Sequence, residues 1–347
     1  MFSGVSLSPN YRTDRSPNHV YVVAEIGMTH DGSFGLAEKL TDAAIKAGAD
    51  IVKYQWHIAE AETLPDAPVP PYFTSEPRFE YFKRTEFSTQ QFSRLCDLCH
   101  DNDVLACISA FSIESVRKIQ ETTCDIIKIP SGELTNIPML REIAGSGLPV
   151  ISSTGMSSWN ELDLAVDTLK PSPSLSILQC SSQYPCPPEN VGLNVIGEII
   201  KRYGLPAGIS DHTLSGATAV ASVALGARIV EKHFTISRKL YGPDAYMSLE
   251  PENFQRMVDG IRYVSTAISA PVDKDDVSAY PDMKSIFQKS IVIEKGVTAG
   301  QTLSLENLAF KKPGTGISPA EVDSVIGKFV KRNLAHNDML SWDDIEK

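Results

Sequence analysis

The 347-residue sequence lacks the features that mark several large protein classes. It has no run of about twenty apolar residues, which a membrane-spanning helix requires. The first twenty residues contain proline, asparagine, arginine and aspartate but no apolar segment, so we expect no secretory signal peptide. Neither a GxGxxG nor a GxxxxGK(S/T) phosphate-binding motif is present. We therefore expect a cytoplasmic protein that does not contact a membrane.

The sequence also has fewer basic than acidic residues. The chain has 32 lysines and arginines against 43 aspartates and glutamates, a formal net charge of −11. An acidic surface argues against nucleic acid or an anionic membrane as the main partner. It remains compatible with an anionic substrate, because one pocket can be locally basic.

The six cysteines show no disulfide framework. Cys96 and Cys99, followed by His100, have the spacing of a c-type haem attachment site. However, they lie in a helical pattern that starts at a capping box, Ser88 to Gln91, and haem attachment requires export. The sequence therefore predicts two buried helix cysteines in a reducing compartment.

Short apolar runs alternate with helical patterns along most of the chain. Eight such β-then-α units in series predict a (β/α)8 barrel, which takes about 250 residues. A doubly wound sheet is the structural alternative. The expected strands are Val20–Ala24, Ile51–Tyr54, Val104–Ile108, Asp125–Lys128, Pro149–Ser152, Leu175–Leu178, Ala207–Ile209 and Ile229–Val230.

The remaining length predicts a second domain. We expect the barrel to occupy residues 1–267 and a polar linker residues 268–285. From 286 to 347, glycines and short alternating segments such as Ser290–Glu294 indicate a small β-rich domain. A proline-rich and aromatic insertion at 57–88 follows the second strand, where a barrel keeps its functional loops.

Polar residues stand where the expected strands end, which in a barrel is the catalytic mouth. Two of them are lysines in otherwise apolar strands, and burying an ammonium group is costly without a partner. With neighbouring hydroxyls they would suit a phosphate and a carboxylate. This set comprises Lys53, Lys128, Ser109, Ser131, Ser153, Ser182 and Ser210.

His212 and His233 end neighbouring strands, which places two imidazoles on one side of the mouth. Neutral imidazoles bind divalent metals, with other positions left for water and substrate oxygens. Glu25, Glu133 and Asp244 are carboxylates able to move protons or orient hydroxyls. The pattern therefore predicts a metal-assisted reaction on an anionic substrate.

Several ordered motifs resemble those of the sialic acid synthase family. They are Ala24-Glu-Ile-Gly-Met-Thr-His-Asp-Gly32, Lys128-Ile-Pro-Ser-Gly-Glu-Leu-Thr-Asn136, Ser153-Thr-Gly-Met156, Tyr184-Pro185, Ser210-Asp-His-Thr213, Glu231-Lys-His-Phe-Thr235, Gly242-Pro-Asp244 and Ser248-Leu-Glu-Pro251. Pro313-Gly-Thr-Gly-Ile-Ser-Pro319 resembles the signature of the family's C-terminal antifreeze-like (SAF) domain. The likeness runs from about residue 20 to the end of the chain.

The resemblance implies a barrel plus a SAF domain in a domain-swapped homodimer. It implies condensation of phosphoenolpyruvate with N-acetylmannosamine or a related N-acetylated amino sugar, giving a nine-carbon 2-keto acid and phosphate. A divalent metal, typically Mn²⁺ with Mg²⁺ or Co²⁺ as alternatives, would sit on His212 and His233. Catalysis would involve Glu25, Glu133, Lys53 and Lys128. Residues expected to meet the sugar are Gln55, Gln183, Tyr184, Asp244 and Lys312.

Four places depart from the family pattern. The segment after the third strand reads Ile108-Ser-Ala-Phe-Ser112, and Ser182 stands where asparagine is common. Ala245 replaces a frequent histidine, and Lys312 replaces an arginine, which keeps the charge but loses the bidentate fork. Apart from Ser182, these changes concern the expected sugar side. We therefore expect the acceptor to vary, with di-N-acetylated 6-deoxy sugars (legionaminic or pseudaminic acid precursors) or a sugar phosphate as candidates.

Two other functions share some of these features. A pyruvate lyase with a Schiff-base lysine would use the same barrel and lysines but would need no paired histidines. A degenerate carbohydrate-binding protein would keep the domains and lose the reaction. Metal dependence together with phosphate release would separate the three.

Overall fold

The computed structural model describes residues 19–69, 71 and 75–346. The prediction that no signal peptide is present concerns residues that, apart from His19 and Val20, lie outside this description. The first part of the barrel domain expected from residue 1 lies outside it as well. The chain divides into two compact units, residues 1–270 and 271–347, and each is described separately below.

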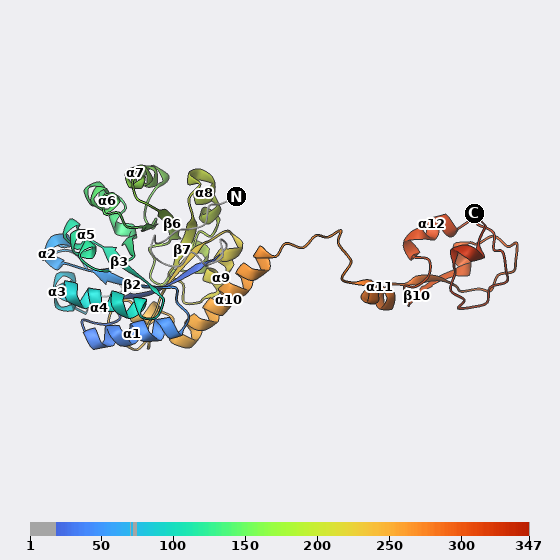
Figure 1. The fold of residues 1–347 in the computed structure, drawn as a ribbon, viewed down its shortest axis with the longest axis horizontal. Coiled ribbons are helices and arrows are strands. Elements are labelled where there is room, and N and C mark those ends of the chain that lie inside the picture. The colour runs from blue at the N-terminus through green and yellow to red at the C-terminus, as the bar shows by residue number, and fades with distance from the viewer. Residues whose placement is uncertain (1–18, 70, 72–74, 347) are drawn as a thin grey trace. The chain divides into compact units, whose positions relative to one another are not determined.

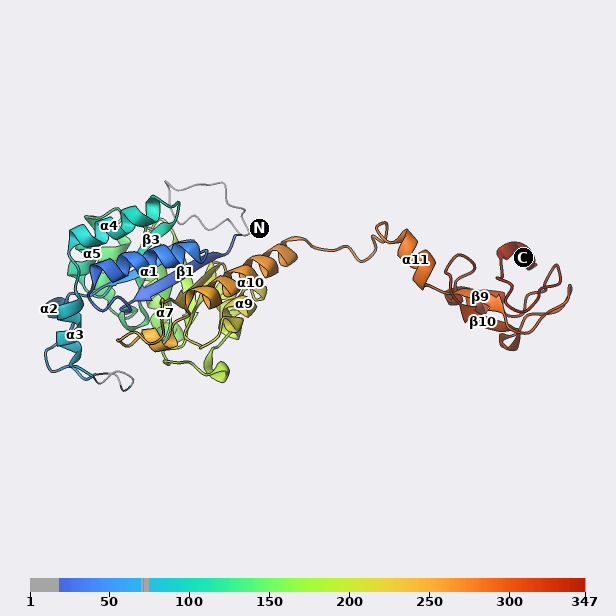
Figure 2. The same cartoon turned by 90° about the horizontal axis from the view of Figure 1, so that it is seen from below.

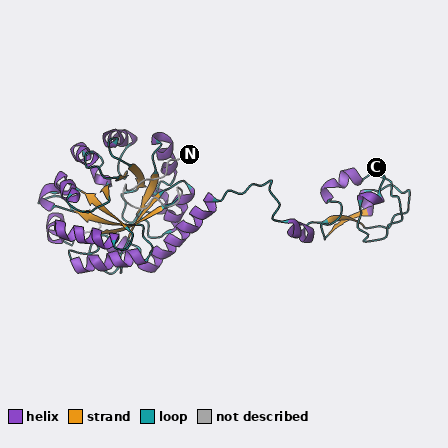
Figure 3. Ribbon diagram, in the orientation of Figure 1, coloured by secondary structure: helices purple, strands orange, loops and turns teal. Residues whose placement is uncertain are grey.

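Eight parallel strands close into a barrel in the first unit (Figures 1 and 3). Each strand pairs with the next in chain order, and the last pairs with the first, so that Glu25 lies opposite His233. This arrangement confirms the predicted (β/α)8 barrel and excludes the doubly wound sheet. The strands are β1 Tyr21–Gly27, β2 Ile51–Trp56, β3 Leu105–Ala110, β4 Ile126–Ile129, β5 Val150–Ser153, β6 Leu175–Cys180, β7 Ala207–Asp211 and β8 Ile229–His233.

A ring of helices surrounds the barrel (Figures 1 and 2). Their inner faces and the outward-facing strand residues form the largest apolar core of the described chain. The helices of this ring are α1 Phe34–Lys46, α4 Thr89–His100, α5 Ile113–Gln120, α6 Ile137–Ala144, α7 Trp159–Leu169, α8 Asn194–Tyr203, α9 Ala217–Ala224 and α10 Pro251–Ser269.

Helix α4 begins where the sequence indicated. Ser88 accepts a hydrogen bond from the Gln91 backbone, and the Gln91 side chain accepts one from the Ser88 backbone in return, which is a capping box. Cys96 and Cys99 lie on the buried face of this helix. The prediction of two helix cysteines is therefore confirmed.

The insertion after β2 is partly helical. It carries α2, Ala59–Glu62, and α3, Arg78–Thr85, whose packing includes the buried side chains of Tyr81 and Phe82. Residues 70 and 72–74 of its proline-rich stretch lie outside the described part of the chain.

The second unit has its own apolar core and a small antiparallel sheet. Strands β9, Ser290–Ile293, and β10, Leu308–Lys311, form this sheet, and the short helix α12 spans Val322–Val325. The structure adds helix α11, Pro281–Phe287, which begins inside the expected linker. Pro281 stands in its first turn, where a missing N–H costs nothing.

We find no helix among the described residues that is both long enough and apolar enough to cross a membrane.

Candidate active site

The inside of the barrel changes from apolar to polar within two residues. Val23, Ile51, Cys107, Ile126, Ile151 and Ile229 belong to a buried apolar cluster inside it. Because side chains on a strand alternate between faces, the residue two positions further along shares the same face. Those residues are Glu25, Lys53, Ser109, Lys128, Ser153 and Glu231. The strand period therefore stacks a polar layer on the apolar one, at the carboxyl ends of the strands.

Lys53 lies at the centre of this polar layer and is 3% exposed. Its ammonium group pairs with Glu25, donates to Ser109 Oγ at 3.1 Å and lies 3.7 Å from Glu231 Oε1. Burial alone would lower the pKa of Lys53, but the charges of Glu231 and Glu25 outweigh it and raise that pKa. Lys53 is therefore a fixed cation.

Lys128 is the second cation of the layer and is 2% exposed. It donates to Ser153 Oγ at 2.7 Å and lies 3.6 Å from Glu231 Oε1. Burial lowers the pKa of Lys128, against the attraction of Glu231. The two buried lysines thus have the carboxylate partners that the cost of burial demands.

Glu231 was not predicted as a functional residue, although it lies in a quoted motif. Its Oε1 atom lies between the two lysines and accepts a hydrogen bond from Ser210 at 2.8 Å. Its Oε2 atom is buried and has no hydrogen-bond partner among the described residues. The indication available in the sequence was its position on the inner face of β8, two residues before His233.

Ser131 and Ser182 lie above the lysines, in the loops after β4 and β6. Ser131 Oγ accepts a hydrogen bond from the Gly155 backbone at 3.0 Å, whereas Ser182 Oγ is buried without a partner among the described residues. Any side chain at Gly155 would collide with both hydroxyls. Glycine at this position therefore keeps the two serines together.

The structure brings the two predicted histidines side by side. The rings of His212 and His233 have centroids 5.4 Å apart, and the Tyr184 ring lies 4.2 Å from the His212 ring at an interplanar angle of 34°. His212 Nδ1 lies 2.8 Å from the Ser181 carbonyl, which holds the ring and leaves Nε2 for another partner. His233 Nδ1 is buried without a hydrogen-bond partner in the described chain.

A chain of contacts leads from Glu25 outward. Gln55 donates to Glu25 Oε1 at 2.7 Å, and His57 Nε2 lies 3.0 Å from Gln55 Oε1. The His57 ring is stacked between Phe82 at 3.8 Å and Phe111 at 4.0 Å. Phe111 belongs to the segment that departs from the family pattern, and its neighbour Ser112 caps helix α5.

A cavity of about 530 Å³ opens above the polar layer. It is lined by the predicted residues Gln55, Ser131, Glu133, Ser182, Tyr184, His233 and Asp244. Sequence reasoning missed its other walls, which the insertion and the loops after the strands supply without a periodic pattern. The missed residues are Met28, His57, Pro68, Val69, Arg78, Tyr81, Phe82, Phe111, Pro130, Gly132, Met156 and Pro243.

Two carboxyl groups in this cavity have a raised pKa. Burial raises the pKa of Glu133, although the hydrogen bond from Asn136 opposes the rise. Burial likewise raises the pKa of Asp244, against a 2.8 Å hydrogen bond from the Met28 backbone. A carboxyl group with a raised pKa is suited to proton transfer near neutral pH.

Of the predicted sugar-side residues, Gln183 does not line this cavity and Lys312 belongs to the second unit. Gln183 is exposed and accepts a hydrogen bond from Asn190 at 2.9 Å, and it does not line the cavity. Lys312 belongs to the second unit, where its ammonium group lies 5.0 Å from the Phe287 ring centroid. Ala245, a departure from the family pattern, is buried beside Asp244.

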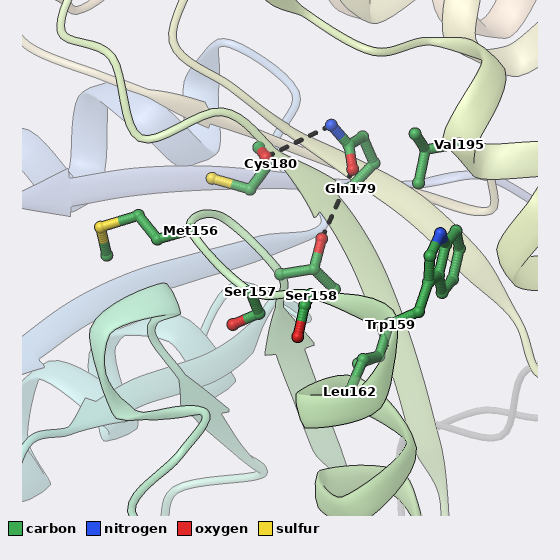
Figure 4. Close-up of a pocket in the computed structure, with 9 residues that line it drawn as sticks. Met156, Ser157, Ser158, Trp159, Leu162, Gln179, Cys180 and Val195 are labelled. Carbon is green, nitrogen blue, oxygen red and sulfur yellow. Dashed lines mark hydrogen bonds between the residues drawn. The ribbon is translucent and has the colours of Figure 1, made fainter.

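A smaller cavity of about 260 Å³ lies beside the mouth, between the loops after β5 and β6. In Figure 4, Val195 and Trp159 lie on one side of Gln179, and Met156 lies on the other side. The Gln179 amide already accepts from Thr154 and donates to the carbonyls of Cys180 and Val191. Its polar groups are thus used in joining the two loops.

Two family models match the sequence. Residues 40–273 match the NeuB family, and residues 288–346 match the SAF domain.

The relatives point to the same family. The N,N'-diacetyllegionaminic acid synthase of Legionella pneumophila is 33% identical over 339 residues, covering 94% of each chain. The N-acetylneuraminate-9-phosphate synthase of Mus musculus is 30% identical, covering 94% of this chain and 92% of that one. The crystal structure of the sialic acid synthetase of Leptospira borgpetersenii, in complex with citrate, superposes with a TM-score of 0.67. It is 29% identical and covers 77% of this chain and 90% of that chain.

Proposed function

The chain belongs to the NeuB family of sugar acid synthases and carries a SAF domain, and on that premise we propose that it condenses phosphoenolpyruvate with an N-acetylated amino sugar. The resemblance inferred from the sequence motifs is thereby confirmed, as is the expectation that the chain is an enzyme. The proposed products are a nine-carbon 2-keto sugar acid and inorganic phosphate.

The observation that carries this proposal is the pair of buried lysines set among serine hydroxyls. Lys53 and Lys128 are fixed by Glu25 and Glu231, and Ser109 and Ser153 accept from them. Phosphoenolpyruvate carries a phosphate and a carboxylate, and fixed cations with hydroxyl donors match both groups. Ser131, Ser182 and Ser210 complete the proposed donor set.

The paired imidazoles fit a divalent metal. His212 Nδ1 is engaged with a backbone carbonyl, and the buried Nδ1 of His233 is without a hydrogen-bond partner in the described chain. Among the described residues no group of three or more histidine, cysteine, aspartate or glutamate side chains is arranged to hold a metal ion. The proposed site therefore has two protein ligands, His212 and His233, and leaves positions for water and substrate. When bound, the metal would supply Lewis-acid polarisation of the sugar's aldehyde oxygen.

The chain's own residues account for the rest of the chemistry. C3 of phosphoenolpyruvate forms a bond to the aldehyde carbon of the open-chain sugar, whose oxygen gains a proton. Water then adds at C2, and Glu133 accepts a proton from it, as its raised pKa permits. The C2–O bond to phosphate breaks with its electron pair on the phosphate oxygen, which takes up the proton of the C2 hydroxyl as that group becomes the 2-keto group. Lys53 and Lys128 balance the negative charge throughout.

Phosphate release tests the proposal directly. The enzyme would be given phosphoenolpyruvate, Mn²⁺ and a panel of acceptors: N-acetylmannosamine, its 6-phosphate and a di-N-acetylated 6-deoxy hexose. We expect release with at least one acceptor and loss of release with a chelator. Release that persists in chelator would remove the metal from the mechanism, and no release with any acceptor would contradict the condensation.

The variant His212→Ala tests the role of the metal separately from the stability of the fold. We expect the variant to lose metal-dependent turnover while its unfolding transition stays cooperative. Full activity in His212→Ala would contradict the metal assignment. Borohydride trapping of a pyruvate adduct would instead favour the lysine Schiff-base lyase.

A further inference from the structure

Arg78 stands out among the residues that line the main cavity. It is the first residue of helix α3 and enters the cavity wall from the insertion after β2. Its Nε atom is buried, yet it has no hydrogen-bond partner among the described residues. A buried guanidinium nitrogen left without an acceptor is costly, so it calls for an oxygen that the protein does not supply.

The guanidinium group is held in place by aromatic stacking. Its central carbon lies 5.2 Å from the Phe82 ring centroid, and Phe82 is stacked on His57, which is stacked on Phe111. A guanidinium stacked on a ring keeps its N–H donors at its edge, free to bond in the plane. The stack therefore orients the donors before any ligand arrives.

Four side chains lie between Arg78 and the buried Lys53 along one path of contacts. The contacts run from Lys53 to Glu25, Gln55, His57, Phe82 and finally Arg78. Phosphoenolpyruvate bound to the lysines would have its reacting carbon near Glu25, at the start of that path. The group that reaches Arg78 is then the far part of the acceptor sugar.

The surroundings of Arg78 indicate the chemistry of that far part. Arg78 is the single lysine or arginine among the described lining residues, and Glu133 and Asp244 line the same cavity. A phosphate dianion would meet two carboxyl groups and one guanidinium, a poor balance. Pro68, Val69 and Phe82 instead offer apolar surface to a methyl group.

We propose that Arg78 determines acceptor specificity by donating to the carbonyl oxygen of a second N-acyl group, so that the preferred acceptor is an uncharged, di-N-acylated hexose. This assignment rests on the proposed condensation. The acyl methyl packs on the apolar wall while the carbonyl takes the guanidinium donors. Arg78 touches the acceptor and leaves phosphoenolpyruvate to the lysines.

The test compares Arg78→Met and Arg78→Lys with wild type on the three acceptors. We expect wild type to prefer the di-N-acetylated sugar, and Arg78→Met to lose about tenfold or more in kcat/KM with that sugar alone, as for one charged hydrogen bond. N-acetylmannosamine, which lacks the second acyl group, should be used equally well by both, and the KM for phosphoenolpyruvate should not change. Arg78→Lys should fall between the two, because lysine keeps the charge without the fork.

Lys83→Met is the matched control, since Lys83 lies on the same helix, is exposed and pairs with Glu60 outside the cavity. It should behave as wild type with every acceptor. An equal loss with both neutral sugars in Arg78→Met, or no loss, would overturn the assignment. So would a wild-type preference for the 6-phosphate.

Failure of the condensation itself gives a different pattern. If no acceptor releases phosphate, calorimetric titration of the same sugars into wild type and Arg78→Met decides the assignment by itself. Weaker binding of the di-N-acetylated sugar to the variant would support it. Equal affinity, or no binding to wild type, would overturn it.

Discussion

The two halves of the candidate active site are built in opposite ways. Around Lys53 and Lys128, the charged groups pair with one another inside the barrel, although Glu231 Oε2 has no hydrogen-bond partner among the described residues, and the strands fix each residue. In the cavity above them, His233 Nδ1 and Arg78 Nε are buried without partners among the described residues. Apart from Gln55 on β2 and His233 at the end of β8, the walls of that cavity come from loops and from the insertion.

The difference separates what the fold determines from what the loops determine. A satisfied ionic network needs no ligand to be stable and keeps its geometry when the loops change. Buried donors without a protein partner in an open cavity can bond to substrate atoms. Those that loops carry can change without disturbing the barrel. We therefore expect the phosphoenolpyruvate half to be common to the family and the acceptor half to vary.

Replacing Lys53 by methionine should have the largest effect. It leaves Glu25 and Glu231 short of a buried counter-charge, which costs about 3–5 kcal/mol of stability. Loss of one fixed positive charge on the substrate should lower kcat by at least about 10²-fold. Urea unfolding and phosphate release measure the two effects. Ordinary turnover in Lys53→Met would contradict this distinction between the two halves, because the half built on the strands would then be dispensable.

Glu231→Gln should come next. The amide keeps the shape and can still accept from Ser210, but it no longer offsets the lysines. We expect inorganic phosphate to bind about tenfold more tightly, a change of about 1.4 kcal/mol. Calorimetry with phosphate alone measures it. Unchanged phosphate affinity would show that Glu231 does not regulate the charge of the site.

Lys312→Arg should have a smaller effect, confined to the acceptor. Restoring the bidentate fork of the family's arginine should change acceptor KM values by a few-fold, about the worth of one exposed charged contact. The KM for phosphoenolpyruvate should stay constant. If the ranking of the three acceptors is identical in both enzymes, Lys312 has no role in specificity.

Asp50→Asn should leave kinetics unchanged and alter only stability. Asp50 lies at the opposite end of the barrel, where it accepts from the Val22 backbone at 2.8 Å and from Arg262. Burial opposes its ionisation, but the hydrogen bond from His19 and the charge of Arg262 outweigh burial and lower the pKa of Asp50 to about 2. The ionised group is therefore worth about 2 kcal/mol at neutral pH.

The pH dependence of that contribution has a definite sign. A carboxyl group whose pKa is lower in the folded state stabilises fully above about pH 4 and loses its effect as the pH falls through about 2. Urea unfolding of wild type and Asp50→Asn across this window should show the difference shrinking. Asp42→Asn, which breaks an exposed pair with Lys46, is the control and should change stability by less than about 0.5 kcal/mol. A difference that grows on acidification would contradict the assignment.

The sequence was sufficient where periodicity governs position. The β-then-α rhythm predicted the barrel, and the polar residue at each strand end predicted the layer that holds Lys53, Lys128, Ser109 and Ser153. Helix α11 was missed because a polar, proline-containing segment looked like a linker. Pro281 there begins a helix, which a proline can do in the first turn.

The acceptor cavity was largely beyond such reasoning. Arg78 and Phe82 come from an insertion with no strand period, and they meet His57 and Phe111 only through tertiary packing. Gln183 shows the converse, because it stands next to Ser182 in the chain yet is exposed and does not line the cavity. A loop that leaves a strand no longer alternates its side chains in a fixed way, so sequence proximity does not place a residue in the cavity.

Glu231 also bears on how the enzyme would work in a cell rich in free phosphate. A pocket with two uncompensated lysines would retain any small anion, including the phosphate that the proposed reaction releases. With Glu25 and Glu231 beside them, the lysines sit in a group of two cations and two anions. A single anion gains little binding free energy from such a group. A substrate that binds through both a phosphate and a carboxylate gains binding free energy from two anionic groups. We therefore expect the buried glutamate to favour phosphate release and to keep the pocket from being blocked between turnovers.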